Sequence, residues 1–243
     1  MGAKMIIIPA RLKSSRFSEK ILCDIGGLPM FIFTAKRVSE IDELCIAVDD
    51  ERVLKIARDY GFKAVLTSLE HKSGTDRINE ACELLGLNEN ELIINVQADE
   101  PFIELENLAK FKDFASSCVG KDAFMASCFK NISAKEAKDS NLVKVVCDEL
   151  GFALYFSRSK LPFERETYTK NFKGHLGIYA YRVGALKEFC SFASSALENA
   201  EKLEQLRALE NGKKIKMLEL QTRSMGIDTK EDYQRALEFL KKF

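Results

Sequence analysis

Short apolar runs alternate with amphipathic stretches along the first hundred or so residues of the chain. The apolar runs that are typical of strands cover residues 5–8, 43–48, 62–66 and 92–96. The stretches between them that are typical of helices cover residues 30–39, 51–60 and 78–85. Strands that alternate with helices of about ten residues are the βαβ signature of a parallel sheet.

The run Leu92–Val96 differs from an amphipathic strand because it shows almost no alternation of apolar and polar positions. Such a run predicts a strand buried on both faces of a parallel sheet. The sequence then turns polar at Gln97, Asp99 and Glu100, and Pro101 ends the pairing. Ligands of open α/β sheets bind beyond the carboxyl ends of strands, and adjacent carboxylates there suit Mg²⁺. An acidic surface turn explains this stretch equally well.

The segment after the first strand is rich in cations and hydroxyls. It carries Arg11, Lys13, Arg16 and Lys20 with serines between them, and it contains no glycine. The absence of glycine excludes a Walker loop and a dinucleotide fingerprint. Its position after the first strand nevertheless favours a phosphate-binding loop, in which charge-assisted hydrogen bonds hold a polyphosphate. The alternative is a solvated basic loop.

Residues 71–77 lead into the third predicted helix. Ser73 and Thr75 are candidate N-cap residues, since their hydroxyls can accept a hydrogen bond from a backbone N–H of the first turn. Gly74 allows a ligand to approach the backbone closely. The alternative is a capped helix start with no ligand.

The second half of the chain departs from the alternating pattern. Further helices are predicted at 104–116, 185–191, 196–209 and 230–241, and strands at 123–129, 142–147, 152–157, 172–181 and 214–220. The strands at 142–147 and 152–157 form a predicted hairpin. Thr229 and Asp232 fit a capping box at the head of the last helix. We therefore expect an α/β fold in one domain, 1–243, with an antiparallel hairpin or arm at about 140–180.

Composition narrows the class of protein. Hydrophobic residues make up 46% of the chain, enough for a sizeable core, and 37 basic residues balance 37 acidic ones. Without net positive charge, nucleic acid is not an expected partner. The seven cysteines include no Cys-x-x-Cys pair, which argues against a zinc site and a secreted disulfide framework. We interpret the cysteines as reduced core thiols of a cytoplasmic protein. No apolar run reaches the length of a membrane span, so no membrane partner is expected.

Several motifs in order along nearly the whole chain resemble those of the 3-deoxy-manno-octulosonate (Kdo) cytidylyltransferases. The motif residues begin with Pro9, Ala10, Arg11, Ser15, Arg16 and Lys20, followed by His71, Ser73, Gly74, Thr75, Asp76 and Arg77, and then Asn95, Gln97, Asp99, Glu100 and Pro101. They continue with Tyr155, Phe156, Ser157 and Arg158, with His175 and Tyr179, with Leu203, Glu204, Gln205 and Arg207, and with Gly226, Ile227, Asp228, Thr229, Glu231 and Asp232.

This resemblance implies a Rossmann-like nucleotidyltransferase fold with a mostly parallel central sheet flanked by helices. It implies a cytoplasmic, Mg²⁺-dependent homodimer that converts CTP and Kdo into CMP-Kdo and pyrophosphate for lipopolysaccharide assembly. The residues implied in catalysis are Lys20, Asp99 and Asp228, and Asp99 and Asp228 would also bind the metal. Those implied in nucleotide binding are Pro9, Ala10, Arg11, Ser15, Arg16, Lys20, Ser73, Gly74, Thr75 and Arg77. Those implied in sugar binding are Gln97, Arg158, His175, Tyr179, Glu204 and Gln205.

Two positions depart from the family pattern. Ser18 stands where the family usually has proline, and Ala98 where it usually has glycine. The first change loosens the expected phosphate loop, and the second is tolerated if the backbone φ at Ala98 is negative.

Other functions fit the same fold. A cytidylyltransferase acting on a sialic acid or on an amino-substituted Kdo differs only in the sugar pocket. A catalytically inactive binding protein would not need both Asp99 and Asp228. A nicotinamide-dependent oxidoreductase would need the missing glycine fingerprint.

Overall fold

The computed structural model describes residues 4–13, 17–166 and 171–241. The chain forms two compact units, one of residues 1–110 and 222–243 and the other of residues 111–221. The single domain expected over 1–243 stays a prediction, because two compact units of one chain can still fold as one.

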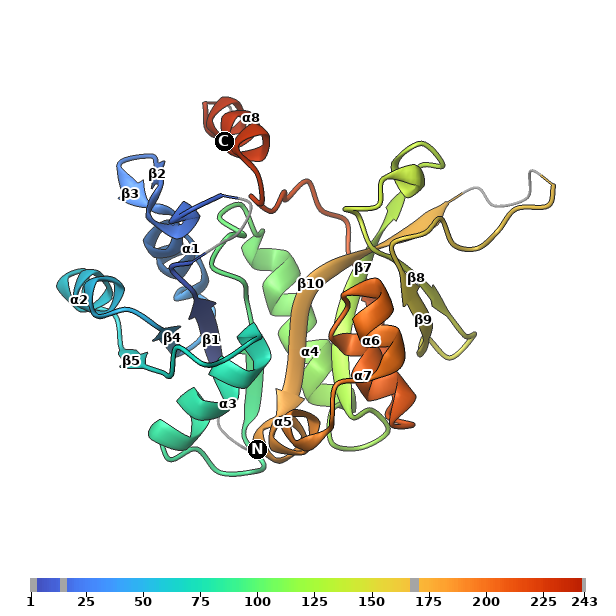
Figure 1. The fold of residues 1–243 in the computed structure, drawn as a ribbon, viewed down its shortest axis with the longest axis horizontal. Helices are drawn as coiled ribbons and strands as arrows, with labels where there is room; N and C mark the ends of the chain where they lie inside the picture. The colour runs from blue at the N-terminus through green and yellow to red at the C-terminus, as the bar shows by residue number, and fades with distance from the viewer. Residues whose placement is uncertain (1–3, 14–16, 167–170, 242–243) are drawn as a thin grey trace. The chain divides into compact units, whose positions relative to one another are not determined.

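A parallel sheet forms the centre of the first unit. Its strands lie in the order β6 (Leu92–Asn95), β1 (Lys4–Ala10), β4 (Leu44–Val48) and β5 (Ala64–Leu66), each parallel to its neighbour. Every residue of β6 is buried, the polar Asn95 included, as the lack of alternation between apolar and polar positions predicts. The mostly parallel α/β fold class expected from the sequence is confirmed (Figure 1).

Three paired strand ends place polar residues at one edge of this sheet. Ala10 pairs with Val48, and Val48 pairs with Leu66. The residues that follow these ends therefore lie side by side at the carboxyl edge, where open α/β sheets bind ligands. The edge thus gathers the start of the loop after β1, Asp49 after β4 and Thr67 after β5.

Helices connect the strands of the first unit. They are α1 (Met30–Val38), α2 (Glu51–Asp59) and α3 (Gly74–Leu84). A short 3-10 helix, η1 (Lys20–Leu22), and a two-strand sheet of β2 (Asp24–Ile25) and β3 (Leu28–Pro29) precede α1. Of the two predicted caps of α3, Ser73 is the N-cap and its hydroxyl accepts the Asp76 N–H, whereas the prediction for Thr75 is wrong. The helix starts at Gly74, so Thr75 already lies inside its first turn.

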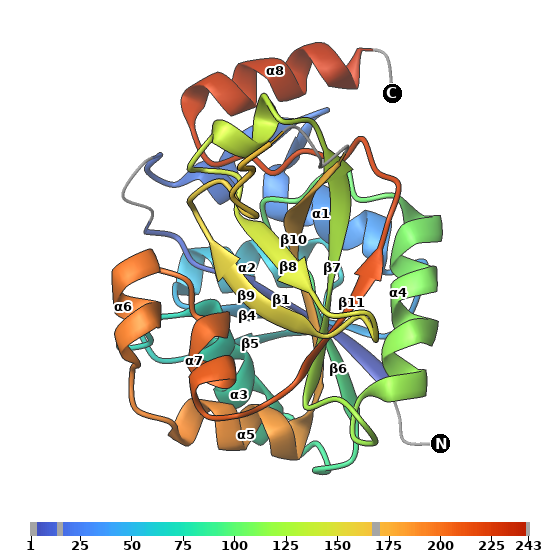
Figure 2. The ribbon, with the colours of Figure 1, turned by 90° about the vertical axis from the view of Figure 1, so that its right-hand side faces the viewer.

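The end of the chain returns to the first unit as α8 (Lys230–Leu240). The predicted capping box is confirmed, since the Thr229 and Asp232 side chains each bond the backbone N–H of the other residue. Ile227 and Ala236 join Ile25, Met30 and Phe102 in a buried cluster. This packing holds α8 against α1 and β2. The ribbon in Figure 2 draws α8 in red next to the blue segments of the first unit.

The second unit is built on antiparallel pairing. The helix α4 (Leu105–Cys118) runs across the boundary into this unit. β10 (Phe172–Arg182) is antiparallel to β7 (Met125–Ile132), and β11 (Ile215–Glu219) is parallel to β7. The short helix η2 (Glu136–Lys138) follows β7. β8 (Lys144–Cys147) and β9 (Ala153–Ser157) form the predicted hairpin (Figure 2).

The remaining helices show one wrong prediction. α5 (Val183–Ser191) forms as expected, but the single helix predicted over 196–209 is two helices, α6 (Ala196–Glu201) and α7 (Gln205–Glu210). Lys202, with φ 53°, ends α6 in the left-handed conformation. The buried Leu203 and Leu206 keep the helical spacing that favoured one helix.

Candidate active site

Two carboxylates far apart in the sequence meet at one ammonium group in the first unit. Lys20 Nζ lies 2.5 Å from Asp99 Oδ2 and 2.8 Å from Asp228 Oδ1, and it donates to the Ile227 carbonyl at 3.0 Å. The Lys20 side chain is 11% exposed, so water screens these contacts only in part. The structure confirms that Asp99 and Asp228 come together.

Local structure explains how the two aspartates meet. Asp99 follows β6, and its carbonyl accepts the Ile227 N–H at 3.0 Å. The two segments approach closely at Gly226, where an added Cβ would lie 2.9 Å from Glu100 Oε1. The backbone bond from Ile227 to Asp99 holds the segment before α8 against the loop after β6, which brings Asp228 to Asp99.

The charge of Lys20 is stabilised by these neighbours. Burial alone lowers the pKa of Lys20, but the Asp99 and Asp228 carboxylates outweigh it and raise the pKa above its ordinary value. Lys20 is therefore protonated at neutral pH, and three oxygens surround a positive charge. Oxygen is the ligand atom that hard cations prefer, so these oxygens also fit the donor set of Mg²⁺.

A pocket of about 270 Å³ opens around this cluster within the first unit. It is lined by Pro9, Arg11, Lys13, Lys20, Ile21, Lys72, Ser73, Gly74, Arg77, Gln97, Ala98, Asp99 and Asp228. The structure thus brings most of the expected nucleotide-site residues to one cavity. Ala10 and Thr75 are buried beside the pocket and do not line it. Ser15 and Arg16 lie outside the described residues.

Arg77 lines the pocket, but its side chain is buried and hydrogen-bonded to other protein groups. Its side chain is 1% exposed, and its guanidinium donates to Thr67 Oγ1 at 2.5 Å and to Asp49 Oδ2 at 3.2 Å. Burial lowers the pKa of Arg77, while Asp49 opposes this shift. The Arg77 guanidinium is therefore held by protein groups before any ligand binds.

The second unit holds most of the residues expected to bind a sugar. The His175 and Tyr179 rings lie 5.4 Å apart, although β10 bulges between Leu176 and Tyr179. The two side chains therefore lie together, and the sugar-binding role that the resemblance implies for them stays a prediction. Burial, and then the charge of Glu204, raises the pKa of Tyr179. Gln205 is buried at the start of α7.

His175 is a neutral imidazole in this structure. Burial lowers its pKa to about 3. Its Nε2 lies 2.8 Å from Ser127 Oγ, and the Ser127 hydroxyl donates to the Ile178 carbonyl at 2.8 Å. Because a hydroxyl has one proton, Nε2 of His175 carries the hydrogen and donates it to Ser127. This tautomer leaves Nδ1 as a hydrogen-bond acceptor.

Arg158 is fixed by backbone carbonyls of the second unit. Its guanidinium donates to the carbonyls of Glu201 at 2.8 Å and Ser140 at 3.1 Å. The buried Lys144 ammonium in turn donates to the Arg158 carbonyl at 2.5 Å. A guanidinium has five N–H donors, so these contacts leave capacity for a carboxylate.

Comparison with known proteins identifies the family. A sequence model described as cytidylyltransferase matches residues 5–215. The 3-deoxy-manno-octulosonate cytidylyltransferase of Wolinella succinogenes is 51% identical over 239 residues, which cover 96% of this chain and 98% of that protein. The chain belongs to the 3-deoxy-manno-octulosonate cytidylyltransferase family.

Further relatives agree with this assignment and make the protein a nucleotidyltransferase enzyme. The 3-deoxy-manno-octulosonate cytidylyltransferase of a Nitratiruptor species is 52% identical over 235 residues, covering 95% of this chain and 97% of that protein. A solved structure of CMP:2-keto-3-deoxy-manno-octonic acid synthetase complexed with CTP superposes with a TM-score of 0.92. It is 33% identical and covers 99% of each chain.

The backbone at Ala98, where the family usually has glycine, can carry a side chain without strain. Outside glycine, only Glu19 and Lys202 have positive φ among the described residues, so the condition set for Ala98 is met. The Ala98 carbonyl accepts the Thr34 hydroxyl at 3.0 Å, which supports the backbone beside Asp99.

Some features of the site escape sequence reasoning. Lys72 lines the pocket, and its signal is a basic residue inside the 71–77 motif. Asp49, the partner of Arg77, is distinguished in the sequence only by its place after a strand.

All seven cysteines are free thiols. No helix within the described residues is both long and apolar enough to cross a membrane.

Proposed function

We propose that this enzyme transfers CMP from CTP to Kdo, releasing pyrophosphate. The observation that carries the proposal is the cluster of Lys20, Asp99 and Asp228 inside a cation-lined pocket of the first unit. The named activities of the relatives and the solved complex of the similar synthetase with CTP support it. In this reaction the anomeric hydroxyl of the sugar attacks the α-phosphate in line with the leaving pyrophosphate, which demands positioning and charge neutralisation.

The pocket residues fit the parts of CTP. Arg11 and Lys20 supply cations for the triphosphate, and the loop position of Arg16 suits the same role. Ser73 and Gly74 are assigned to the cytidine side. An added Cβ at Gly74 would lie 3.3 Å from Pro9 Cγ, so a side chain there would crowd the wall of the pocket.

Asp99 and Asp228 would hold Mg²⁺ in the loaded enzyme. Among the described residues no group of three or more His, Cys, Asp or Glu side chains can hold a metal ion. Two carboxylates nevertheless suffice for Mg²⁺, because it commonly keeps waters and binds substrate phosphates as further ligands. The bound ion would supply positive charge close to the phosphate oxygens.

Side chains of the second unit are assigned to the sugar acid. Arg158 offers a fixed positive charge for the Kdo carboxylate. His175 and Tyr179 offer hydrogen bonds to hydroxyls, and Glu204 and Gln205 precede and begin α7 beside them. Gln97 belongs to the first unit, where it donates to Asn95 Oδ1 at 3.1 Å.

Replacing His175 by glutamine should impair use of Kdo more than binding of CTP. Loss of a neutral hydrogen bond should raise KM for Kdo by about fivefold. Because burial lowers the His175 pKa to about 3, the imidazole is neutral above pH 5. The profile of kcat/KM against pH from 5 to 8 should therefore keep its shape in the variant. Steady-state kinetics with each substrate varied in turn measure both quantities.

His71→Gln is the matched control, because His71 is the other histidine of the chain and bonds Glu80 in the first unit. It should leave KM for Kdo within about twofold. A His175→Gln enzyme that loses affinity for CTP while its KM for Kdo stays constant would contradict the sugar assignment.

A pyrophosphate-release assay tests the proposed reaction and its alternatives. The enzyme should release pyrophosphate with CTP and Kdo, and turnover with ATP, GTP or UTP should be far slower. Sialic acids and amino-substituted Kdo belong in the same panel, since they differ from Kdo in the groups that the sugar pocket would contact. Faster turnover with one of these acids would reassign the substrate. No release with any pair would favour an inactive binding protein.

We further propose a cytoplasmic homodimer that acts in lipopolysaccharide biosynthesis. The β8–β9 hairpin exposes Leu150 and Leu154, which are 72% and 61% exposed, and a second copy would cover them. Sedimentation equilibrium would detect the dimer, and charged replacements of both leucines should shift it toward monomer.

A further inference from the structure

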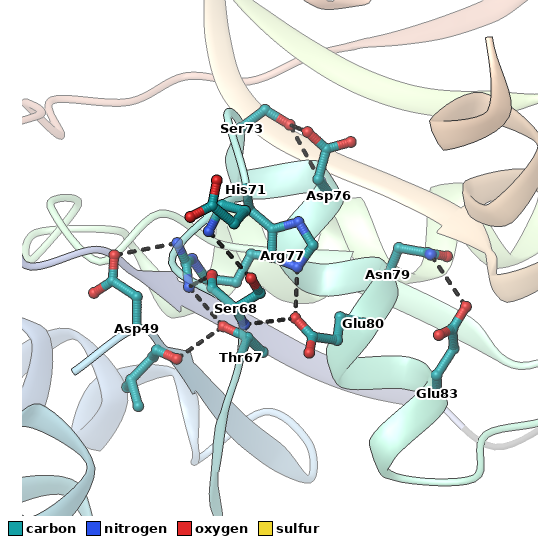
Figure 3. A network of polar contacts seen from close by, with 12 residues as sticks. Asp49, Thr67, Ser68, His71, Ser73, Asp76, Arg77, Asn79, Glu80 and Glu83 are labelled. Atoms are coloured by element: carbon teal, nitrogen blue, oxygen red, sulfur yellow. Dashed lines mark hydrogen bonds and ion pairs between the residues drawn. The ribbon is translucent and has the colours of Figure 1, made fainter. Parts of the chain in front are cut away.

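Arg77 and Asp49 form a buried ion pair under the nucleotide pocket. The Arg77 side chain is 1% exposed and that of Asp49 is 4% exposed. Arg77 reaches Asp49 after β4 and also Thr67 and the Ser68 carbonyl after β5 (Figure 3). One guanidinium on α3 therefore joins the ends of two strands.

The same hydrogen-bond network also includes the loop after β1. Asp49 Oδ1 accepts the backbone N–H of Leu12 at 2.9 Å, while Oδ2 accepts from Arg77. The Leu12 side chain is buried, whereas the flanking Arg11 and Lys13 are exposed and line the pocket. Fixing Leu12 on both its backbone and side chain thus sets the direction of the cations on either side of it.

The ion pair is better suited to positioning than to stability. A buried salt bridge often gives no more stability than apolar residues of similar volume, because desolvation offsets the attraction. A guanidinium fork nevertheless fixes its partners in a defined geometry. Asp49 uses both oxygens, so Arg77 orients the oxygen that holds Leu12.

We propose that Arg77 and Asp49 are positioning residues that hold the Leu12 backbone and so aim Arg11 and Lys13 at the triphosphate. This inference rests on the proposed function, since it assumes that the pocket binds CTP. In this proposal Arg77 acts through Asp49 and the loop after β1. The family resemblance implies instead that Arg77 lies beside the nucleotide.

The test uses the double variant Asp49→Leu with Arg77→Met in the full chain. Apolar replacement of both partners avoids an unpaired buried charge, so the variant should fold and melt close to the wild type. Calorimetric Kd for CTP with Mg²⁺, without sugar, should rise by about tenfold or more. In the ligand-free protein the Leu12 amide should exchange with deuterium faster.

Thr67→Val is the matched control, because it removes one Arg77 contact and leaves the bond from Leu12 to Asp49 in place. It should change Kd for CTP by less than about twofold. A folded double variant with wild-type CTP affinity overturns the proposal. So does weaker CTP binding with unchanged Leu12 exchange, which is the signature of direct contact between Arg77 and the nucleotide.

A double variant that fails to fold is replaced by Arg77→Lys, which keeps the charge but lacks the fork needed to reach Asp49 and Thr67 together. Its Kd for CTP should rise severalfold and its Leu12 exchange should speed up, and wild-type values of both overturn the proposal. Failure of the proposed reaction is seen separately, as wild-type enzyme that binds CTP but releases no pyrophosphate with Kdo.

Discussion

Replacing Asp99 or Asp228 by asparagine should lower turnover by ~100-fold or more, the loss seen when other preorganised electrostatic groups are removed. Each change removes a negative charge from the oxygens around Lys20 and nearly preserves shape, so the variants should fold. Each should also need more Mg²⁺ for half-maximal rate, because a carboxylate is a stronger ligand of a hard cation than an amide. Pyrophosphate release measured across a Mg²⁺ titration gives both quantities.

The matched control is Asp59→Asn at the exposed end of α2, which makes the same charge change away from the pocket lining. It should leave turnover and the Mg²⁺ requirement unchanged. Calorimetric titration of Mg²⁺ into each variant separates metal binding from catalysis. A folded Asp99→Asn or Asp228→Asn enzyme with near-normal turnover at low Mg²⁺ would show that its carboxylate serves only as a surface or capping acid.

Replacing Lys20 by methionine should weaken CTP binding by about 10- to 100-fold, since a charge-assisted hydrogen bond to phosphate contributes ~1.5–3 kcal/mol. The variant should also be less stable without metal, because Asp99 and Asp228 then face each other without the ammonium. Added Mg²⁺ should raise Tm more in this variant than in the wild type, where the ion must compete with Lys20. Calorimetry with CTP and thermal melts with and without Mg²⁺ measure these effects.

Lys13→Met is the control for this prediction. Lys13 lines the same pocket but is exposed, so its loss should weaken CTP binding less and leave the response of Tm to Mg²⁺ unchanged. If Lys20→Met and the wild type gain equal stability from Mg²⁺, the two aspartates do not share a cation.

The first unit shows how far a sequence can specify a site. The sequence of β6 shows almost no alternation of apolar and polar positions and so predicts a strand buried on both faces. Ligands of parallel sheets bind beyond the carboxyl ends of the strands, which places Asp99 at the ligand-binding edge. The capping box at Thr229 fixes the start of α8 and hence the position of Asp228 just before it. Local signals therefore place each aspartate at the end of an element, and the family resemblance adds that the two act at one metal.

Contacts made by long polar side chains were harder to predict. The cation cluster after β1 gives no sign that Lys20 would turn onto Asp99 and Asp228, and a lone acid after a strand gives no sign that Asp49 would pair with Arg77. Such contacts depend on tertiary packing that periodicity does not encode. The sequence also does not predict the break between α6 and α7. Lys202 adopts a left-handed conformation there, without the glycine or asparagine that usually marks one.

The return of residues 222–243 to the first unit has a consequence for synthesis of the chain on the ribosome. Lys20 and Asp228 are 208 residues apart, so at ~5–20 residues per second the ribosome adds Asp228 roughly 10–40 s after Lys20. From the addition of Asp99 until Asp228 follows, the nascent first unit has its strands and its cationic loop but only one of the two carboxylates. A chain released early, or trimmed before residue 228, therefore keeps most of the nucleotide pocket and lacks the acid that completes it.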